Sequence, residues 1–269
     1  MTDTISPTQP AAACRRLADR RAVVTGGGSG IGAAAARRLV AEGAGVAVLD
    51  ARADAAHDVA GALKADGGEA HAFACDVGDP AAVEDAVASS ARALGGIDCV
   101  VACAGIARPG ATHQTTLDEW DTIIRVNLTG VFLTVRATVP HLLEAGGGTI
   151  VTIGSVASLV AAGQTSSYDA AKGGVLQFTR AVAVEYADQG IRANCLCPGV
   201  VRTGLAANTR ALHGPAAGPP QGVAARLPIP MDRAADPSEL AAVVAFLCSD
   251  DSSFVTGAAI AADGGYTAI

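Results

Sequence analysis

The stretch RAVVTGGGSGIG, residues 21–32, joins a short apolar run to a glycine-rich turn. The run RAVVT (21–25) holds β-branched residues and predicts a buried strand. Glycines after such a strand let the backbone approach a pyrophosphate closely, and the helix that follows offers free N–H groups and a positive dipole end. The usual G-x-G-x-x-G template fits only loosely, as Gly28-x-Gly30-x-x-Ala33, so a plain flexible turn stays open until more of the chain is read.

The same alternation of strand and helix continues along the chain. Short apolar runs predict further strands at 45–50, 70–75, 97–103, 149–155, 191–197 and 258–263. Helical patterns lie between them, near 30–43, 53–66, 79–94, 117–143, 166–188 and 237–249. Several strands are apolar almost without alternation, which is typical of parallel strands buried on both faces. We therefore predict an α/β fold, a single-domain doubly wound, Rossmann-type parallel sheet of seven strands with helices on both faces.

The composition fits one buried core. The 269 residues are 50% hydrophobic and 17% charged, which argues against disorder. The net charge of −7 lacks the basic footprint of nucleic-acid binding, and no run of 18 apolar residues predicts a membrane span. Seven cysteines, odd in number and without a C-x-x-C pair, predict buried reduced thiols of a cytoplasmic protein rather than disulfides or a metal site.

Two segments fall outside the alternation. Residues 1–16 are polar and rich in Pro and Ala, without the apolar core of a signal peptide, and we expect a flexible tail there. Residues 17–269 then form the single domain. Within it, residues 204–230 (GLAANTRALHGPAAGPPQGVAARLPIP) are rich in Gly and Pro at their centre. This segment is expected to emerge beside the carboxyl ends of the strands. Such an insertion is typical of a substrate lid, with a disordered surface insertion as the alternative.

Acidic side chains follow the second and third strands. Asp50 ends the second strand, 20 residues beyond Gly30. A carboxylate there accepts hydrogen bonds from the ribose hydroxyls of an adenosine and repels a 2′-phosphate, which predicts NAD rather than NADP. Arg52 lies close by and would soften that repulsion. Asp76 closes the third strand, where it could reach the adenine or cap a turn, and both readings stay open.

The stretch YDAAK (168–172) carries the candidate chemistry. Tyr168 and Lys172 are four residues apart on a predicted helix, so they share one face. An ammonium beside a phenol favours the phenolate, which brings the phenol closer to the pH at which acid/base catalysis is efficient. Read without context, an exposed Tyr–Lys pair on a helix surface would explain the same residues.

Two more polar residues give that pair a context. Ser155 ends a predicted strand, where an open α/β sheet presents side chains to a ligand, and its hydroxyl can hold a substrate oxygen. Asn127 lies on the apolar stripe Trp120, Ile124, Asn127, Val131, Val135 of the helix over 117–143. A buried amide needs partners, so Asn127 is either a structural hydrogen-bonder or the holder of a water in a proton path.

With these residues in place the chain resembles the short-chain dehydrogenase/reductase family over about residues 17–269. The matching motifs, in chain order, are TGGGSGIG (25–32), Asp76–Val77, ACAG (102–105), Asn127, Ser155, YDAAK (168–172), PGVVRT (198–203) and DGG (263–265). Their joint order and spacing are specific, although each motif alone is weak. One motif departs from the family, which usually reads N-N-A-G where this chain has Ala102-Cys103-Ala104-Gly105, and we expect weaker local bracing there.

The resemblance implies roles for single residues. Tyr168 would be the general acid/base, and Lys172 would support it and bind the nicotinamide ribose. Ser155 would orient the substrate oxygen, and Asn127 would anchor a water that links Lys172 to solvent. Val201, by its backbone, and Thr203 would hold the nicotinamide carboxamide. The full set of cofactor-binding residues implied in this way is Gly26, Gly28, Ser29, Gly30, Ile31, Gly32, Asp50, Asp76, Val77, Ala104, Gly105, Tyr168, Lys172, Pro198, Gly199, Val201 and Thr203.

The implied reaction is NAD-dependent hydride transfer between a nicotinamide cofactor and a secondary alcohol or ketone. One alternative is a 3-oxoacyl thioester reductase using NADPH, which Asp50 disfavours. Another is a dinucleotide-binding sensor without catalysis, which the intact set Asn127, Ser155, Tyr168 and Lys172 disfavours. No G-x-S-x-G elbow surrounds Ser155 and no metal-ligand cluster is visible, so neither a serine hydrolase nor a zinc-dependent alcohol dehydrogenase is expected. The resemblance further implies a homotetramer acting on a small-molecule alcohol or ketone, without nucleic acid or membrane.

Overall fold

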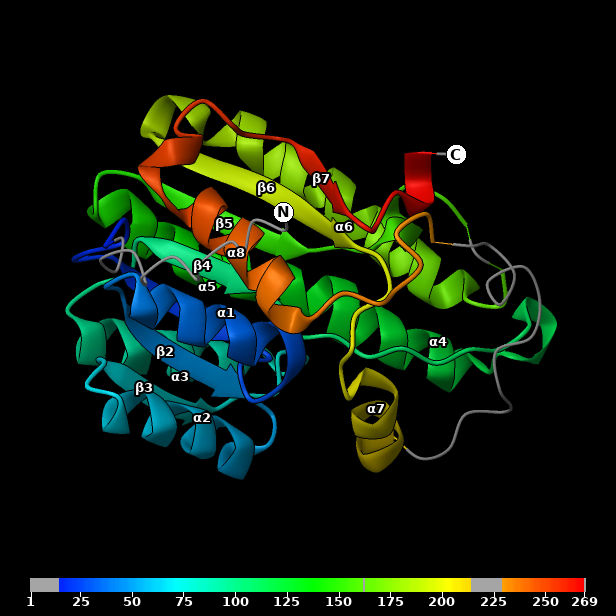
Figure 1. Cartoon of the computed structure of the whole chain (residues 1–269). Helices are drawn as coiled ribbons and strands as arrows, with labels where there is room; N and C mark the ends of the chain where they lie inside the picture. The colour runs from blue at the N-terminus through cyan, green and yellow to red at the C-terminus, as the bar shows by residue number, and fades with distance from the viewer. Residues whose placement is uncertain (1–14, 162, 214–228, 269) are drawn as a thin grey trace, which may run out of the picture.

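The computed structural model describes residues 15–161, 163–213 and 229–268. In this part of the chain, seven strands form one sheet in the order β3-β2-β1-β4-β5-β6-β7, and every neighbouring pair is parallel (Figure 1). Their bounds are β1 Arg21–Thr25, β2 Gly45–Asp50, β3 Ala70–Ala74, β4 Cys99–Ala102, β5 Gly148–Ile153, β6 Ile191–Pro198 and β7 Ala259–Ala262. The predicted seven-stranded, doubly wound sheet is confirmed.

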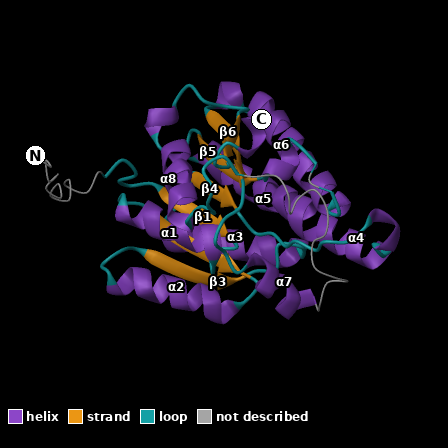
Figure 2. Cartoon of the chain, turned by 45° about the vertical axis from the view of Figure 1, so that its right-hand side comes forward, coloured by secondary structure: helices purple, strands orange, loops and turns teal. Residues whose placement is uncertain are grey.

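Helices cover both faces of this sheet, as Figure 2 shows in a view that brings the right-hand side of Figure 1 forward. Helices α1, α2 and α8 pack on one face, and α3, α5 and α6 pack on the other. The helix bounds are α1 Gly30–Ala41, α2 Ala53–Ala65, α3 Pro80–Leu94, α4 Leu117–Ile124, α5 Gly130–Glu144, α6 Ser166–Glu185, α7 Leu205–His213 and α8 Pro237–Cys248. The predicted strands and helices all exist, and their outer ends differ from the predicted ones by at most three residues.

The strand β1 shows why the buried runs lack a polar face. Ala22 and Val24 point into the core beside α1 and α8, whereas Val23 points into the core on the opposite face. All three are fully buried, because successive side chains alternate between two covered faces. A strand in such a sheet therefore needs apolar residues at every position.

The helix predicted over 117–143 is interrupted. A π-helical turn, Arg125–Thr129, separates α4 from α5, and the Gly130 N–H donates to the Arg125 carbonyl five residues back. The whole run Leu117–Glu144 is long and apolar enough to cross a membrane by length and composition alone, but 56% of its most apolar window is buried inside the protein. Its packing is that of a core helix.

The segment predicted as a lid contains a helix that the sequence pattern did not indicate. Residues 205–213 form α7, and residues 214–228 lie outside the described part of the chain. Residues 1–14 of the predicted tail also lie outside it. The described end of that tail contacts the fold, because Arg16 forms ion pairs with Glu42 and Asp251.

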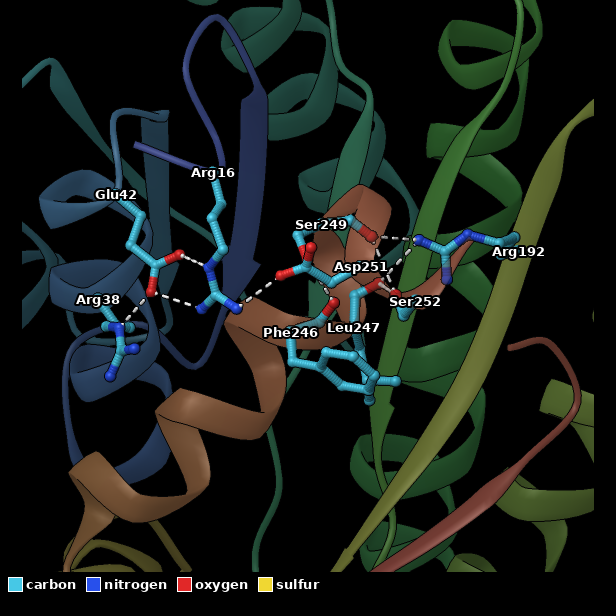
Figure 3. Close-up of polar contacts among 9 residues, drawn as sticks. All are labelled: Arg16, Arg38, Glu42, Arg192, Phe246, Leu247, Ser249, Asp251 and Ser252. Carbon is cyan, nitrogen blue, oxygen red and sulfur yellow. Dashed lines mark hydrogen bonds and ion pairs between the residues drawn. The ribbon is translucent and has the colours of Figure 1, made fainter. Parts of the chain in front are cut away.

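These ion pairs belong to a charged network at the amino-terminal edge of the sheet (Figure 3). The buried carboxylate of Glu42 accepts hydrogen bonds from Arg16, at 2.8 Å to each oxygen, and from Arg38. Burial acts to raise the pKa of Glu42, but the hydrogen bonds from Arg16 and Arg38 outweigh it and lower that pKa below its usual value. The network joins the N-terminal segment to the end of α1 and to the turn after α8.

Arg192, at the start of β6, also lies at the amino-terminal ends of the strands. Its guanidinium donates to the carbonyl oxygens of Leu247, Ser249 and Val255 at 3.0–3.1 Å. Leu247 lies in the last turn of α8, where a helix leaves its last acceptors unsatisfied, and Ser249 and Val255 follow that helix. Arg192 therefore links the start of β6 to the end of α8 and the turn after it, at the opposite end of the strands from the site described next.

Candidate active site

A cavity of about 650 Å³ opens at the carboxyl ends of the strands. It lies beside the neighbouring strands β1 and β4, where the order of successive strands across the sheet changes direction. Ligands of open α/β sheets usually bind at this position. The turn after β1, the loops after β2 to β5, the segment after β6 and helix α7 all contribute to its lining. The segments that the sequence marked as functional thus meet at one edge.

The glycine turn after β1 is shaped by close backbone contacts. Gly26 has φ +63°, and a Cβ there would lie 2.7 Å from the Ala104 Cα. A Cβ at Gly32 would lie 2.2 Å from the Gly26 carbonyl oxygen. Side chains at these two positions are excluded. The result is a cradle of bare backbone that leads into the N-terminus of α1, where no acidic residue lies in the first turn.

The Asp50 carboxylate at the end of β2 is fixed by two backbone donors. Its oxygens accept from the Gly28 N–H and the Arg52 N–H, both at 3.0 Å. A Cβ at Gly28 would lie 2.8 Å from the same carboxylate, so this glycine lets the turn approach Asp50. The Arg52 guanidinium lies 3.9 Å from Asp50 and partly offsets its charge.

The segment Ala102–Gly105, which departs from the family pattern, is braced by Thr25. The Thr25 hydroxyl accepts from the Cys103 N–H at 3.2 Å and from the Ala104 N–H at 3.4 Å. One side chain at the end of β1 therefore holds the turn that follows β4. The weaker bracing expected from the sequence is offset by this contact.

Asn127 is fully buried in the π-helical turn and binds the loop after β4. Its amide accepts from the Ile106 N–H at 3.0 Å and donates to the Ile106 and Ile123 carbonyl oxygens at 2.9 and 3.1 Å. A Cβ at Gly105 would lie 2.7 Å from Asn127 Oδ1 and 3.5 Å from Lys172 Nζ. Asn127 thus fixes the backbone beside the cavity, and Gly105 leaves room between it and Lys172.

Ser155 lies two residues beyond the end of β5, not at its last residue as the sequence suggested. Its hydroxyl accepts from the Ala157 N–H at 3.1 Å and caps the short turn Val156–Ser158. The Ser158 hydroxyl accepts from the Ser155 N–H at 3.2 Å and donates to the Lys172 carbonyl oxygen at 2.7 Å. Ser158 therefore links the Ser155 turn to α6, a role that sequence reasoning missed.

Helix α6 carries Tyr168 and Lys172 on the side that faces the cavity. Lys172 is 3% exposed, and its ammonium donates to the Ile153 carbonyl oxygen at 2.7 Å. The same nitrogen lies 5.7 Å from the centre of the Tyr168 ring. The positive charge of Lys172 is thus held beside the Tyr168 ring in the lining of the cavity.

Asp76 and the segment after β6 complete the cavity. The Asp76 carboxylate accepts from the Gly78 N–H at 2.9 Å and pairs with Arg125 at 3.1 Å. It lies two residues past β3 and therefore acts as a turn cap while also lining the cavity. In the segment after β6, Val201 and Thr203 line the same cavity, and the Thr203 N–H donates to the Val201 carbonyl oxygen at 2.8 Å.

All the predicted site residues except Gly28 and Gly32 line this one cavity. These two glycines do not line the cavity, but their lack of a side chain allows the close contacts described above. Further described lining residues lie outside the matched motifs, namely Ala51, Arg52, Cys75, Ile106, Ala107, Val126, Ile153, Gly154, Leu205 and Asn208, whereas Cys103 and Val200 lie inside two of those motifs. Most continue strands or turns that were predicted, but Leu205 and Asn208 come from the unpredicted helix α7.

Comparisons with known proteins agree with this geometry. The family model that matches residues 26–267 is described as enoyl-(acyl carrier protein) reductase. Cis-4-hydroxycyclohexanecarboxylate dehydrogenase of Sinomonas cyclohexanicum is 44% identical over 258 residues, 94% of this chain and 98% of that protein. D-threitol dehydrogenase of Mycolicibacterium smegmatis is 40% identical over 252 residues, 94% of each chain. A crystal structure of a short-chain type dehydrogenase/reductase from Mycobacterium marinum has a TM-score of 0.86 and 36% identity, with 95% of this chain and 98% of that chain covered.

Proposed function

The chain belongs to the short-chain dehydrogenase/reductase family, whose enzymes act on CH–OH groups with a nicotinamide cofactor, and we propose that it oxidises a small secondary alcohol with NAD and uses Tyr168 as the general base. The observation that carries the proposal is the pairing of Lys172 with Tyr168 at the mouth of a cavity that the glycine turn also lines. The bare backbone of the turn and the first turn of α1, free of acidic residues, fit a dinucleotide pyrophosphate.

The proposed roles follow from the contacts. A nicotinamide held by the residues that line the cavity would, in its oxidised form, supply the acceptor for a hydride from the carbinol carbon. Tyr168 removes the hydroxyl proton, and Lys172, held by the Ile153 carbonyl, stabilises the phenolate that accepts this proton. Ser155 hydrogen-bonds the substrate oxygen from its capped turn, and Asn127 holds the loop at Ile106 that faces the substrate. The remaining lining residues named from the sequence bind the cofactor.

Asp50 supports NAD over NADP. Its two oxygens already accept from two backbone N–H groups and point into the cavity lining, so the carboxylate is held where ribose hydroxyls could donate to it. A 2′-phosphate at the same place would meet a fixed negative charge. The Arg52 guanidinium lies 3.9 Å from the Asp50 carboxylate, so it would offset only part of the repulsion between that carboxylate and the phosphate.

A neutral alcohol is the proposed substrate class. Arg108, in the loop after β4, forms an ion pair with Glu119 at 3.3 Å, and its charge is thereby compensated within the protein. The described lining near Tyr168 offers Ile106, Ala107 and Leu205, which suit carbon atoms of a small ring or chain. Two relatives act, by their names, on D-threitol and on cis-4-hydroxycyclohexanecarboxylate, and the hydroxyl-bearing chain and ring of these compounds support a sugar-derived or cyclic secondary alcohol.

The description of the matching family model suggests reduction of an enoyl thioester as a second function, and a 3-oxoacyl thioester reductase using NADPH is a related one. Enoyl reductases of the family lengthen the gap between the Tyr and the Lys, whereas here three residues separate Tyr168 from Lys172. The two relatives named above are dehydrogenases of alcohols, and Asp50 disfavours NADPH. Alcohol oxidation is therefore the better supported reaction.

The experiment is an activity panel with both cofactors. Cyclohexanol, D-threitol, cis-4-hydroxycyclohexanecarboxylate and a 3-oxoacyl thioester are each assayed with the oxidised or reduced forms of NAD and NADP. We expect NAD-linked turnover of the two neutral alcohols. Turnover confined to the thioester with NADPH would contradict the proposal, and a strong preference for the carboxylate would contradict the neutral-substrate assignment.

A homotetramer is the proposed assembly in a cytoplasmic location. Helices α5 and α6 expose apolar side chains on their outer side, among them Phe132, Leu143 and Val184, which are 40% to 82% exposed. Phe132 stacks edge-on against Phe178 of α6, so part of this patch is already ordered. Exposed apolar patches of this kind suit burial against another copy. Light scattering tests the assembly, and a monomer would refute it.

A further inference from the structure

Ser29 begins helix α1 but does not cap it. A serine at this position usually accepts a hydrogen bond from the second or third N–H of its helix. Ser29 has extended backbone and lines the cavity, yet its hydroxyl makes no capping bond. It accepts instead from Asn208 Nδ2 at 3.1 Å. The hydroxyl is therefore turned away from the helix terminus by a side chain 179 residues further along the chain.

Asn208 is well placed for this contact because α7 is attached on both sides of the cavity. The next residue, Thr209, is buried and accepts from the Ala107 N–H at 3.2 Å in the loop after β4. The start of α7 is held by Thr203, whose hydroxyl accepts from the Leu205 N–H at 3.4 Å. Helix α7 thus spans from the glycine turn to the loop that faces the substrate.

We propose that Asn208 is a positioning residue for the cofactor pyrophosphate, which acts by holding the Ser29 hydroxyl away from the N-terminus of α1. An intrahelical cap by Ser29 would compete with an anion for the N–H groups of the first turn. Asn208 removes this competitor and is itself uncharged, so it adds no repulsion toward a diphosphate. The inference rests on the proposed function, because it requires that a dinucleotide binds at this turn.

Binding measurements separate this role from a general effect on α7. The affinities of ADP-ribose, which carries the diphosphate, and of adenosine, which lacks it, are measured by calorimetry for the wild type and for Asn208→Ala. We expect Asn208→Ala to weaken ADP-ribose binding roughly fivefold, as for loss of one hydrogen bond, and to leave adenosine binding unchanged. Equal losses for both ligands, or no loss for either, would overturn the proposal.

Three further variants sharpen the test. Asn208→Ala should have no effect on ADP-ribose affinity in a Ser29→Ala background, because no hydroxyl is left to compete, and additive losses would contradict the proposed route. Asn208→Asp should weaken ADP-ribose binding more than Asn208→Ala does, and added salt should reduce the difference. Thr209→Val removes the other attachment of α7 but keeps the Asn208 amide, so it should weaken ADP-ribose binding less than Asn208→Ala does; a loss as large as that of Asn208→Ala would overturn the proposal.

Failure of this inference is distinct from failure of the proposed function. A wild-type protein that does not bind ADP-ribose would refute dinucleotide binding itself. A wild-type protein that binds it, together with an unaffected Asn208→Ala variant, would refute only the role of Asn208.

Discussion

The ammonium nitrogen of Lys172 lies 5.7 Å from the centre of the Tyr168 ring, one helical turn away on α6. The spacing of four residues puts both side chains on one face, and burial of Lys172 keeps its charge from being screened by water. The Ile153 carbonyl oxygen at 2.7 Å fixes the ammonium in this position. The end of β5 thus fixes one member of a helical pair inside the cavity, and this arrangement is the basis of the proposed acid/base role.

Ser158 should affect turnover without affecting cofactor binding. Its hydroxyl links the Ser155 N–H to the Lys172 carbonyl oxygen, so Ser158→Ala removes a contact that fixes the Ser155 turn against α6. We expect kcat to fall roughly tenfold, as for loss of about 1.4 kcal/mol of positioning. The affinity for NADH should stay unchanged. Ser89→Ala on α3 is the control, and equal kcat values for both variants would contradict this role.

Asp50 should set the cofactor preference. Asp50→Asn keeps the shape of the side chain and removes its charge, so the ratio of kcat/KM for NADP over NAD should rise about tenfold or more. Steady-state kinetics with both cofactors measure this ratio. Asp54→Asn makes the same charge change on the first turn of α2 and should leave the ratio unchanged. An unchanged ratio in Asp50→Asn would remove the basis for NAD specificity.

The network at Glu42 should give the protein an acid-sensitive stability. Because the pKa of Glu42 is lowered in the folded state, its contribution is fully present above the usual carboxyl pKa of about 4.3 and is lost as the pH falls through the folded value. Glu42→Gln should cost about 1–3 kcal/mol at pH 7, and the difference from the wild type should shrink on acidification.

Urea unfolding between pH 7 and about pH 2, which spans the range below the usual carboxyl pKa, measures this effect. Glu84→Gln is the control, because Glu84 pairs with Arg136 on the surface with both side chains about half exposed, and it should cost less than about 1 kcal/mol. A gap between the wild type and Glu42→Gln that stays constant with pH would contradict the assigned linkage.

Two glycines should respond oppositely to alanine. Gly61 lies inside α2 at an exposed position, and a Cβ there would meet no atom within 4 Å, so Gly61→Ala should stabilise the fold by about 0.5–1 kcal/mol. Gly32→Ala would place a Cβ 2.2 Å from the Gly26 carbonyl oxygen and should disrupt the turn. Urea midpoints compare both with the wild type, and a destabilised Gly61→Ala would contradict the open space described.

The sheet and most of the site could be predicted because the signals are local. Parallel strands buried on both faces read as continuous apolar runs, and parallel connections bring their carboxyl ends to one edge. The glycine turn, Asp50 and the Tyr168–Lys172 pair each follow or precede such a run. Placing the elements was therefore enough to bring these residues together.

The missed features depend on contacts between distant segments. The π-helical turn arises where Asn127 binds the backbone of Ile106, and no periodicity in residues 117–143 reports that partner. Helix α7 is short and lies in a segment rich in Gly and Pro, so the sequence pattern alone does not predict a helix there. Asn208 and Ser158 are single polar residues whose partners, Ser29 and Lys172, come from other parts of the chain.

The most direct test of the account is a Tyr168→Phe variant assayed with NAD and the best secondary alcohol, followed by NADH absorbance. The variant lacks only the phenolic oxygen that is proposed to move the proton. We expect its kcat/KM to fall by at least about 100-fold, while its affinity for NADH changes far less. A Tyr168→Phe enzyme that reduces NAD at the wild-type rate would contradict the central claim that Tyr168 is the general acid/base.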